Sequence, residues 1–338
     1  MEQAAKWSKW LQRLAAGRKE KNKPVHPFWV IVHKEITDTV TSWRFLILVG
    51  IMLLTSIGSL YTAFSGIRSV DPSQDGLNSF LFLKLFTLSD GTMPNFITFI
   101  SFLGPLLGIG LGFDAVNSER NKGTLSRIMS QPIHRDYIIN AKFTAALIII
   151  AILFFGLGFV TMGLGLFNIG IPPTPEEFLR LLAFLALSVF YVAFWLNLAI
   201  LFSVRFRQPA TSALSGIGVW LFFSVFYSMI INLIGNALAP SQTASTDEIL
   251  GYAHTIQFLS RLSPSQLFSD ATQTLLMPET RALGLITYEQ AYGALPGPLP
   301  LGQSLLLVWP QLTGLIAATL ICFAIAYVWF MRQEIRSR

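Results

Sequence analysis

Ionisable side chains are scarce in this sequence of 338 residues. Asp, Glu, Lys and Arg together make up 12% of it, whereas 53% of the residues are apolar. A typical soluble domain has about twice that charged fraction. Six blocks contain none of these four residue types and no histidine: Phe45–Phe64, Phe96–Phe113, Phe143–Leu166, Leu181–Val204, Ser212–Ile234 and Ser304–Phe330. Each is close to the ~20 residues that a helix needs to cross a bilayer. The sequence therefore predicts an all-α integral membrane protein with six transmembrane helices.

Other absences exclude classes of function. Cys322 is the only cysteine, which excludes an intrachain disulfide and a metal site built from cysteines. The phosphate-binding motif GxxxxGK(S/T) does not occur, so the chain cannot hold ATP in the manner of a P-loop protein. Since no block contains an ionisable residue, an ion-coupled carrier and an intramembrane protease are disfavoured. We expect no enzymatic activity and no bound cofactor in this chain itself.

The basic residues that do occur are distributed unevenly. Nineteen of the 24 Lys and Arg lie before the first block, between the second and third, between the fourth and fifth, or after the sixth. Because loops rich in Lys and Arg stay in the cytoplasm, these segments and both termini are predicted to be cytoplasmic. The net charge of +6 is attributed to contact with anionic lipid and not to nucleic acid, since no compact basic domain exists.

The polar segments then divide the chain into four parts. Before the first block, residues 6–14 alternate Trp and Leu with basic residues at helical spacing, which is typical of a helix on the membrane surface. A second amphipathic stretch from Pro27 is predicted to be an interfacial elbow helix. The parts are residues 1–44, with these cytoplasmic helices; 45–234, with five spans and a loop at 114–142; 235–303, a large extracytoplasmic loop; and 304–338, the sixth span and a cytoplasmic tail.

Two more helices are predicted inside the large loop, over Ile249–Leu262 and Ser265–Met277, separated by Pro264. We expect them to pack over the outer mouth of the bundle.

The loop at residues 114–142 has the most informative sequence. Gly123 is a natural break between two helical stretches. Thr124–Ser130 can form about two helical turns, which must end before Pro132 because a proline disfavours helical geometry in the residue before it. One face of these turns is apolar: Leu125, Ile128 and Met129. Such a face in the cytoplasm needs either the membrane surface or a partner protein to cover it.

Two carboxylates precede these turns. Asp114 and Glu119 follow the second block and lie close in sequence to Arg120, Arg127 and Arg135. Ion pairs among them would stiffen the joint, so that a push on the short helix moves the span. The alternative is that they are ordinary solvated charges at a membrane boundary, where each pair contributes little.

The loop resembles the pattern of ABC-2-type ABC transporter permeases. The residues that carry the resemblance are Glu119, Gly123, Thr124, Leu125, Pro132, Arg135 and Lys142, with Lys34 and Glu35 similar to the start of the elbow helix of that family. The resemblance implies that the loop forms a coupling helix that fits a groove on a separate ATP-binding cassette subunit. The coupling residues would then be Asp114, Glu119, Gly123, Thr124, Leu125, Ile128, Met129, Pro132 and Arg135, with Lys34 and Glu35 in the elbow helix.

The function implied is that of the permease subunit of an ATP-driven exporter in the plasma membrane of a prokaryote. Such a subunit pairs with a second copy or a paralogue, and ATP and Mg bind to the partner subunit. Two alternatives stay open. One is a non-transporting membrane scaffold or sensor that partners with an ATPase. The other is a carrier or channel that works alone, which the charge-free spans disfavour.

Overall fold

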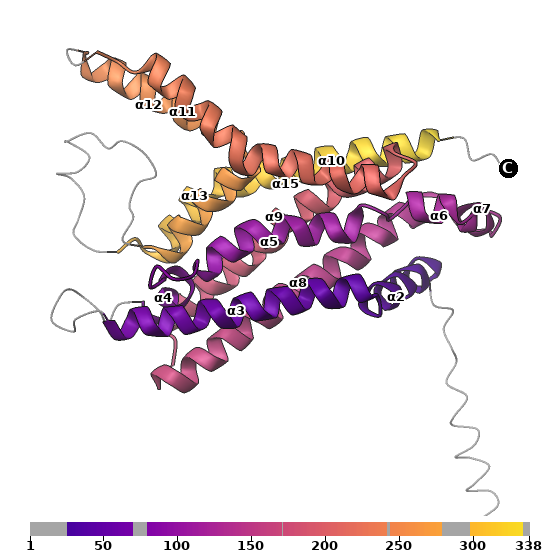
Figure 1. Ribbon diagram of the computed structural model, residues 1–338, viewed down its shortest axis with the longest axis horizontal. Helices are drawn as coiled ribbons and strands as arrows, with labels where there is room; N and C mark the ends of the chain where they lie inside the picture. The colour runs from indigo at the N-terminus through magenta and orange to yellow at the C-terminus, as the bar shows by residue number, and fades with distance from the viewer. Residues whose placement is uncertain (1–25, 70–79, 171, 242–243, 279–297, 334–338) are drawn as a thin grey trace, which may run out of the picture.

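The computed structural model describes residues 26–69, 80–170, 172–241, 244–278 and 298–333 (Figure 1). The surface helix predicted for residues 6–14 lies outside these ranges. Every regular element in the described residues is helical. Six helices are long and apolar enough to cross a membrane, at Trp43–Ile67, Phe96–Asn121, Asp136–Ile169, Pro175–Arg205, Pro209–Leu238 and Leu301–Arg332. Because each overlaps one of the predicted blocks, the prediction of six spans is confirmed.

The described helices run from α2 near the start of the chain to α15 near its end. The order along the chain is α2 Pro27–Val40, α3 Trp43–Ser69, α4 Leu81–Thr87, α5 Phe96–Gly112, α6 Asn117–Asn121, α7 Thr124–Met129, α8 Asp136–Ile169, α9 Pro175–Arg205, α10 Pro209–Leu221, the π-helical η1 Phe222–Phe226, α11 Tyr227–Leu238, α12 Thr246–Ser260, α13 Pro264–Leu276 and α15 Leu301–Arg332. The fourth span, α9, is the centre of the bundle. In its most apolar stretch 83% of the residues are buried, against 11% in the fifth span.

Close packing of α5 on α9 depends on three glycines spaced by four residues, Gly104, Gly108 and Gly112. A Cβ atom on Gly108 would lie 2.8 Å from the backbone oxygen of Val192, and one on Gly112 would lie 2.8 Å from that of Leu196. These distances are shorter than van der Waals contact, so the two backbones touch without intervening side chains. Small residues allow this approach between membrane helices, where dispersion forces favour association.

The two helices predicted in the large loop are present as α12 and α13, but α13 does not merely cover the bundle. The Tyr252 hydroxyl donates a hydrogen bond to the Gly235 oxygen of α11 at 2.9 Å, so α12 returns along α11. Helix α13 then packs between α9 and α15, where Phe268 stacks on Tyr191 with ring centroids 4.3 Å apart. Apolar residues on one face of α13, Phe268 and Leu275 among them, are buried and draw the helix into the core.

The two ends of the bundle differ in their polar contacts (Figure 1). Helices α2, α6 and α7 and the last turn of α15 lie at one end, called the α7 end below, and α4 lies at the other. At the α4 end the fully buried Arg180 donates to the Leu275 oxygen at 3.0 Å, to Ser304 Oγ at 3.1 Å and to Glu176 at 2.9 Å. These bonds join α9, α13 and α15, and they satisfy a guanidinium that is costly to bury unpaired.

We predict that Gly108→Ala lowers the midpoint of thermal unfolding in detergent. The added methyl group must separate two backbones that are in contact, and overpacking of this kind costs about 1–3 kcal/mol. The matched control is Gly156→Ala in α8, because a Cβ atom there meets nothing within 4 Å. A Gly108→Ala variant as stable as Gly156→Ala would refute the packing argument.

Candidate functional site

The segment between α5 and α8 forms a short hairpin of two helices at the α7 end. Gly123 lies between α6 and α7 with φ +67°, a left-handed conformation that favours glycine. Helix α7 spans Thr124–Met129 and ends before Pro132, as the sequence predicts. The Thr124 hydroxyl donates to the backbone oxygen of Glu119 at 3.2 Å. This bond holds the two short helices together across the glycine.

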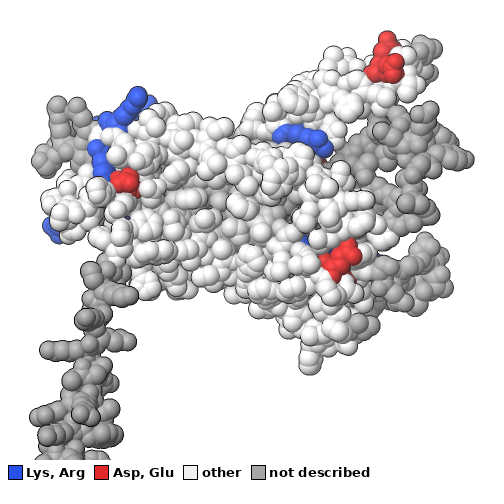
Figure 2. All heavy atoms as spheres, turned by 180° about the vertical axis from the view of Figure 1, so that it is seen from behind, with Lys and Arg blue, Asp and Glu red and all other residues white. Residues whose placement is uncertain are grey.

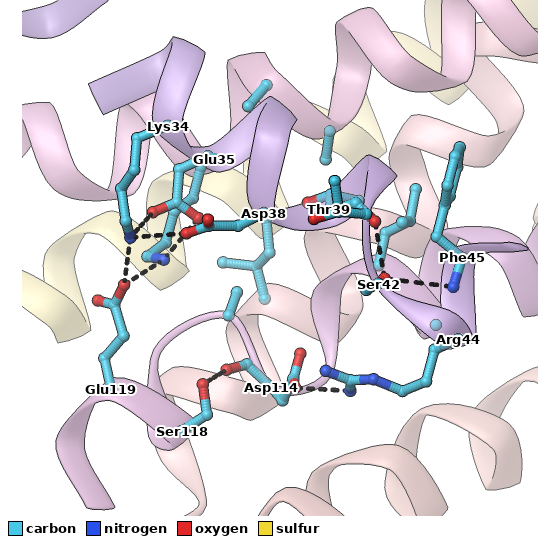
Figure 3. A pocket seen from close by; sticks show the side chains of 18 of the residues that line it. Lys34, Glu35, Asp38, Thr39, Ser42, Arg44, Phe45, Asp114, Ser118 and Glu119 are labelled. Atoms are coloured by element: carbon cyan, nitrogen blue, oxygen red, sulfur yellow. Dashed lines mark hydrogen bonds and ion pairs between the residues drawn. The ribbon is translucent and has the colours of Figure 1, made fainter. Parts of the chain in front are cut away.

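Five side chains from three segments form a charge cluster at this end: Lys34, Glu35 and Asp38 of α2, Glu119 of α6 and Lys142 of α8. The Lys142 ammonium lies at the centre and is only 6% exposed. Its Nζ is 2.9 Å from Glu35 Oε2 and 2.8 Å from Glu119 Oε1. Lys34 contacts the same two carboxylates from the outside, at 2.9 Å and 3.6 Å. Figure 3 shows Glu35 and Glu119 turned toward each other from different helices.

The pKa values of two groups in the charge cluster follow from this geometry. Burial raises the pKa of Glu35, but the positive charges of Lys142 and Lys34 and their hydrogen bonds outweigh burial, so the net pKa is below its ordinary value. For Lys34, partial burial lowers the pKa. The negative charges of Glu35, Glu119 and Asp38 and the hydrogen bond to Glu35 together raise it by more, so the net pKa is above its ordinary value. The cluster therefore holds Glu35 as a carboxylate and Lys34 as an ammonium.

The second predicted carboxylate is joined to a different helix. Asp114 Oδ2 is 2.6 Å from the Arg44 guanidinium at the start of α3, in a pair that is exposed on the arginine side. The sequence predicted that these carboxylates pair with Arg120, Arg127 or Arg135. This prediction is wrong, since Asp114 pairs with Arg44 and Glu119 with Lys142 and Lys34. Neighbours in sequence on a short helix point in different directions, and α2, α3 and α8 supply the closer cations.

Arg135 has another role. Its Nη2 donates to the backbone oxygens of Phe330 at 2.7 Å and Gln333 at 2.6 Å, at the C-terminal end of α15. A cation there donates to carbonyls that lack a partner within the helix, and its charge interacts favourably with the negative end of the helix dipole. Arg135 thus joins the end of the loop to α15.

The loop also forms hydrogen bonds to α9 and to the residues just beyond it. Ser203 Oγ accepts hydrogen bonds from the backbone nitrogens of Val116 at 2.9 Å and Asn117 at 3.2 Å. The Asn121 side chain donates to the Arg207 oxygen, just beyond α9, at 3.0 Å. Together with the ion pairs, these bonds connect the loop to α2, α3, α8, α9 and α15.

The apolar face of α7 is covered by the protein itself. Leu125 is 1% exposed, and Ile128 and Met129 pack half-buried against the same core. The bundle therefore supplies the cover that the sequence argument assigned to a membrane surface or a partner. The residues left exposed around the tip of the loop are Asn121, Lys122, Gly123, Arg127, Ser130, Gln131, Pro132 and His134.

A cavity of about 620 Å³ lies between this loop and α2, α3 and α8. Its polar wall includes Lys34, Arg44, Asp114 and Lys142, and Figure 3 looks into it. Within the described ranges, no group of three His, Cys, Asp or Glu residues is placed to hold a metal ion. The arrangement fixes helices relative to one another.

Sequence reasoning did not place Arg44 or Asp38 in the site, and it named Lys142 only as part of the family pattern, without a partner. Lys142 had one available signal, because it is a single cation immediately before an apolar block and so must be either exposed or paired. The partner on α2 had no local signal, since Glu35 and Lys142 are far apart in the sequence.

We predict that Lys142→Met destabilises the protein by about 3 kcal/mol, because it leaves two carboxylates facing each other without the buried cation that they share. Lys34→Met removes a half-exposed cation from the same cluster and should cost about 1 kcal/mol or less. The comparison is made by thermal unfolding in detergent at neutral pH. Equal losses in the two variants would show that burial of Lys142 is not what makes it important.

We also predict that acid weakens this end of the bundle. A carboxyl group whose pKa is lowered in the folded state stabilises fully above its ordinary value, here 4.5, and loses this contribution as the pH falls through its folded pKa. As the pH is lowered from 5, the midpoint temperature of thermal unfolding should therefore fall less for the Glu35→Gln variant than for the unmodified protein. Parallel curves for both proteins would contradict the assignment.

Comparison with known proteins agrees with this architecture. The family described as ABC-2 family transporter protein matches residues 29–335. Two bacterial relatives share the name "Probable ABC transporter permease protein NosY". The one from Pseudomonas aeruginosa is 26% identical over 207 residues, which are 60% of this chain and 69% of the relative. The one from Stutzerimonas stutzeri is 24% identical over 313 residues, which are 90% of this chain and 98% of the relative. The chain therefore belongs to the ABC-2 family of transporter proteins and is a permease subunit of an ABC transporter.

Proposed function

We propose that this permease works in an ATP-driven exporter and that the loop at residues 114–142 is where a separate ATP-binding cassette subunit drives it. The observation that supports this proposal is the number of helices that the loop holds. Its ion pairs and hydrogen bonds reach α2, α3, α8, α9 and α15. A force on the tip of the loop therefore acts on most of the bundle at once.

The exposed tip and the buried contacts have different roles in this proposal. The ATP-binding subunit contacts the outward face around Lys122, Gly123 and Arg127. Leu125, Ile128 and Met129 transmit the force into the bundle because they are packed against its core. Glu119 passes it to α8 through Lys142, and Asp114 passes it to α3 through Arg44. Pro132 follows the end of α7, and Arg135 fixes the other end of the loop at α15. ATP and Mg bind to the partner subunit.

The orientation in this proposal follows the basic residues. The α7 end faces the cytoplasm, with both termini on that side, and α2 lies as an elbow helix along the inner membrane surface. The membrane is the plasma membrane of a prokaryote, which agrees with the bacterial origin of the two relatives. Residues 235–303 then face outward.

A second permease copy or a paralogue completes the assembly. In the most apolar stretches of the first and fifth spans only 28% and 11% of the residues are buried within one chain. These faces are available to lipid and to a second subunit. Spans without fixed charge favour a hydrophobic or amphipathic cargo.

The rival function is a membrane scaffold or sensor that borrows an ATPase without transporting anything. It is tested with the purified complex in vesicles, by measuring ATP hydrolysis in the presence of a panel of amphipathic compounds. Stimulation by a compound that also accumulates across the vesicle membrane supports the exporter. Accumulation without nucleotide would instead indicate a carrier that works alone.

The docking proposal predicts that the tagged chain, purified from its native membranes in mild detergent, retains a soluble protein with a P-loop. Lys122→Glu and Arg127→Glu should each lower the retained amount several-fold, because both reverse an exposed charge at the tip. Asp247→Lys, an equal reversal on exposed α12, is the control and should retain it.

Coupling is separated from docking by Glu119→Gln. This variant should keep the partner but lose most of the compound-stimulated ATP hydrolysis, since the bond to Lys142 no longer has its charge. Full stimulation in Glu119→Gln would refute the role of the charge cluster in transmission, and full retention in both tip variants would refute the docking site.

A further inference from the structure

The charged residues that line a second polar pocket at the α7 end are all arginines. Its walls are Arg120, Arg205, Phe206, Arg207, Trp329, Arg332 and Gln333, and its volume is about 630 Å³. In the part of the chain that the structure describes, none of its four arginines takes part in an ion pair. Figure 2, seen from behind, shows Lys and Arg side chains gathered at this end of the molecule. We propose that this arginine pocket binds the headgroup of an anionic phospholipid, with a preference for a lipid that has two phosphates.

The depth of the arginine pocket matches that of lipid phosphates. Arg205 is the last residue of α9, and Arg332 is the last residue of α15. Arg207 lies just before Pro209, where α10 begins. Three spans therefore leave the hydrocarbon at the pocket, at the level of the headgroups. Trp329 beside it is 42% exposed, and tryptophan is enriched at this level of a membrane.

The surface leading to the pocket is suited to acyl chains. On α15, Ile321, Ile325 and Val328 are exposed by 59%, 39% and 42%, and their spacing of four and three residues puts them on one face. Arg332 follows four residues after Val328 and ends the same stripe. A lipid whose chains lie along this stripe has its phosphate beside Arg332.

The chemistry of the walls favours a phosphate. A guanidinium is always ionised and presents a planar fork that binds phosphate oxygens in pairs. Four such groups without a carboxylate among the lining residues repel one another, and an anion with two phosphates relieves that repulsion better than a single charge does. A docked acidic protein segment is the less favoured occupant, because the exposed tip of α7 is separate from this pocket and the pocket continues into a lipid-facing stripe.

The test is a titration of the purified full-length chain in neutral detergent with diphosphatidylglycerol, in which native mass spectrometry measures the bound fraction. Each basic residue near an anionic surface contributes about fivefold in affinity. Arg205→Gln with Arg332→Gln should therefore weaken binding by about 25-fold. The matched control is Lys122→Gln with Arg127→Gln, which removes two charges at the same end outside the pocket and should change binding by less than about twofold.

Two further arms identify the source of the phosphate. Phosphatidylcholine should bind much more weakly than diphosphatidylglycerol, and inorganic pyrophosphate should not displace the bound lipid. Displacement by pyrophosphate would overturn the proposal in favour of a soluble anion. Equal weakening in the two double variants would overturn it in favour of general charge attraction.

A third result separates the lipid from a protein partner. If the pocket variant binds diphosphatidylglycerol normally but no longer retains an ATP-binding subunit, the pocket is a protein contact and the proposal fails. If the double variant does not fold, Arg205→Gln and Arg332→Gln are measured singly, each with an expected loss of about fivefold. The titration needs neither ATP nor a partner, so its outcome is independent of the exporter proposal.

Discussion

Lys142 is 6% exposed at the edge of an apolar bundle, where an unpaired ammonium group costs several kcal/mol to desolvate. Two carboxylates on different segments, Glu35 and Glu119, make this position tolerable. The requirement is mutual, because a carboxylate that turned away would lose its contact with this buried cation. Helix α2, the loop helix α6 and the span α8 are therefore fixed to one another through the buried Lys142, with Lys34 contacting the same carboxylates from the outside.

The same constraint separates the two ends of the molecule from its middle. Arg180 does at the α4 end what Lys142 does at the α7 end, with its charge satisfied by carbonyls, a hydroxyl and Glu176. Between them the spans have no Asp, Glu, Lys, Arg or His and are held mainly by dispersion contacts, most closely where Gly108 meets the backbone of α9. The Tyr191 hydroxyl adds a hydrogen bond to the Ser101 oxygen of α5 at 3.0 Å. Ion pairs thus fix the ends, while most contacts of the middle are non-directional and compatible with small shifts of one helix along another.

The features that could be predicted from the sequence are those set by local rules, and the features that could not be predicted are set by how the helices pack. The six spans follow from the absence of charge over ~20 residues, and the ends of α7 follow from Gly123 and Pro132, because both are local rules. The partners of Glu119 and Asp114 could not be found, since they come from α2, α3 and α8 and depend on how the helices pack. The π-helical segment Phe222–Phe226 and the insertion of α13 beside Tyr191 have the same explanation, as tertiary packing decides both.

The two proposed binding surfaces meet on one short helix. Helix α6 is only five residues long, yet Glu119 belongs to the charge cluster and its neighbour Arg120 lines the arginine pocket. An anion beside Arg120 and a force applied through α7 therefore act on the same element from two sides. Since a ligand shifts an equilibrium only by its differential affinity for the two states, a headgroup bound to α6, α9 and α15 together favours the arrangement in which these three helices are close. Anionic lipid would then oppose any movement of the loop that separates α6 from α15, and the energy that the ATP-binding subunit must supply would depend on the lipid beside the permease.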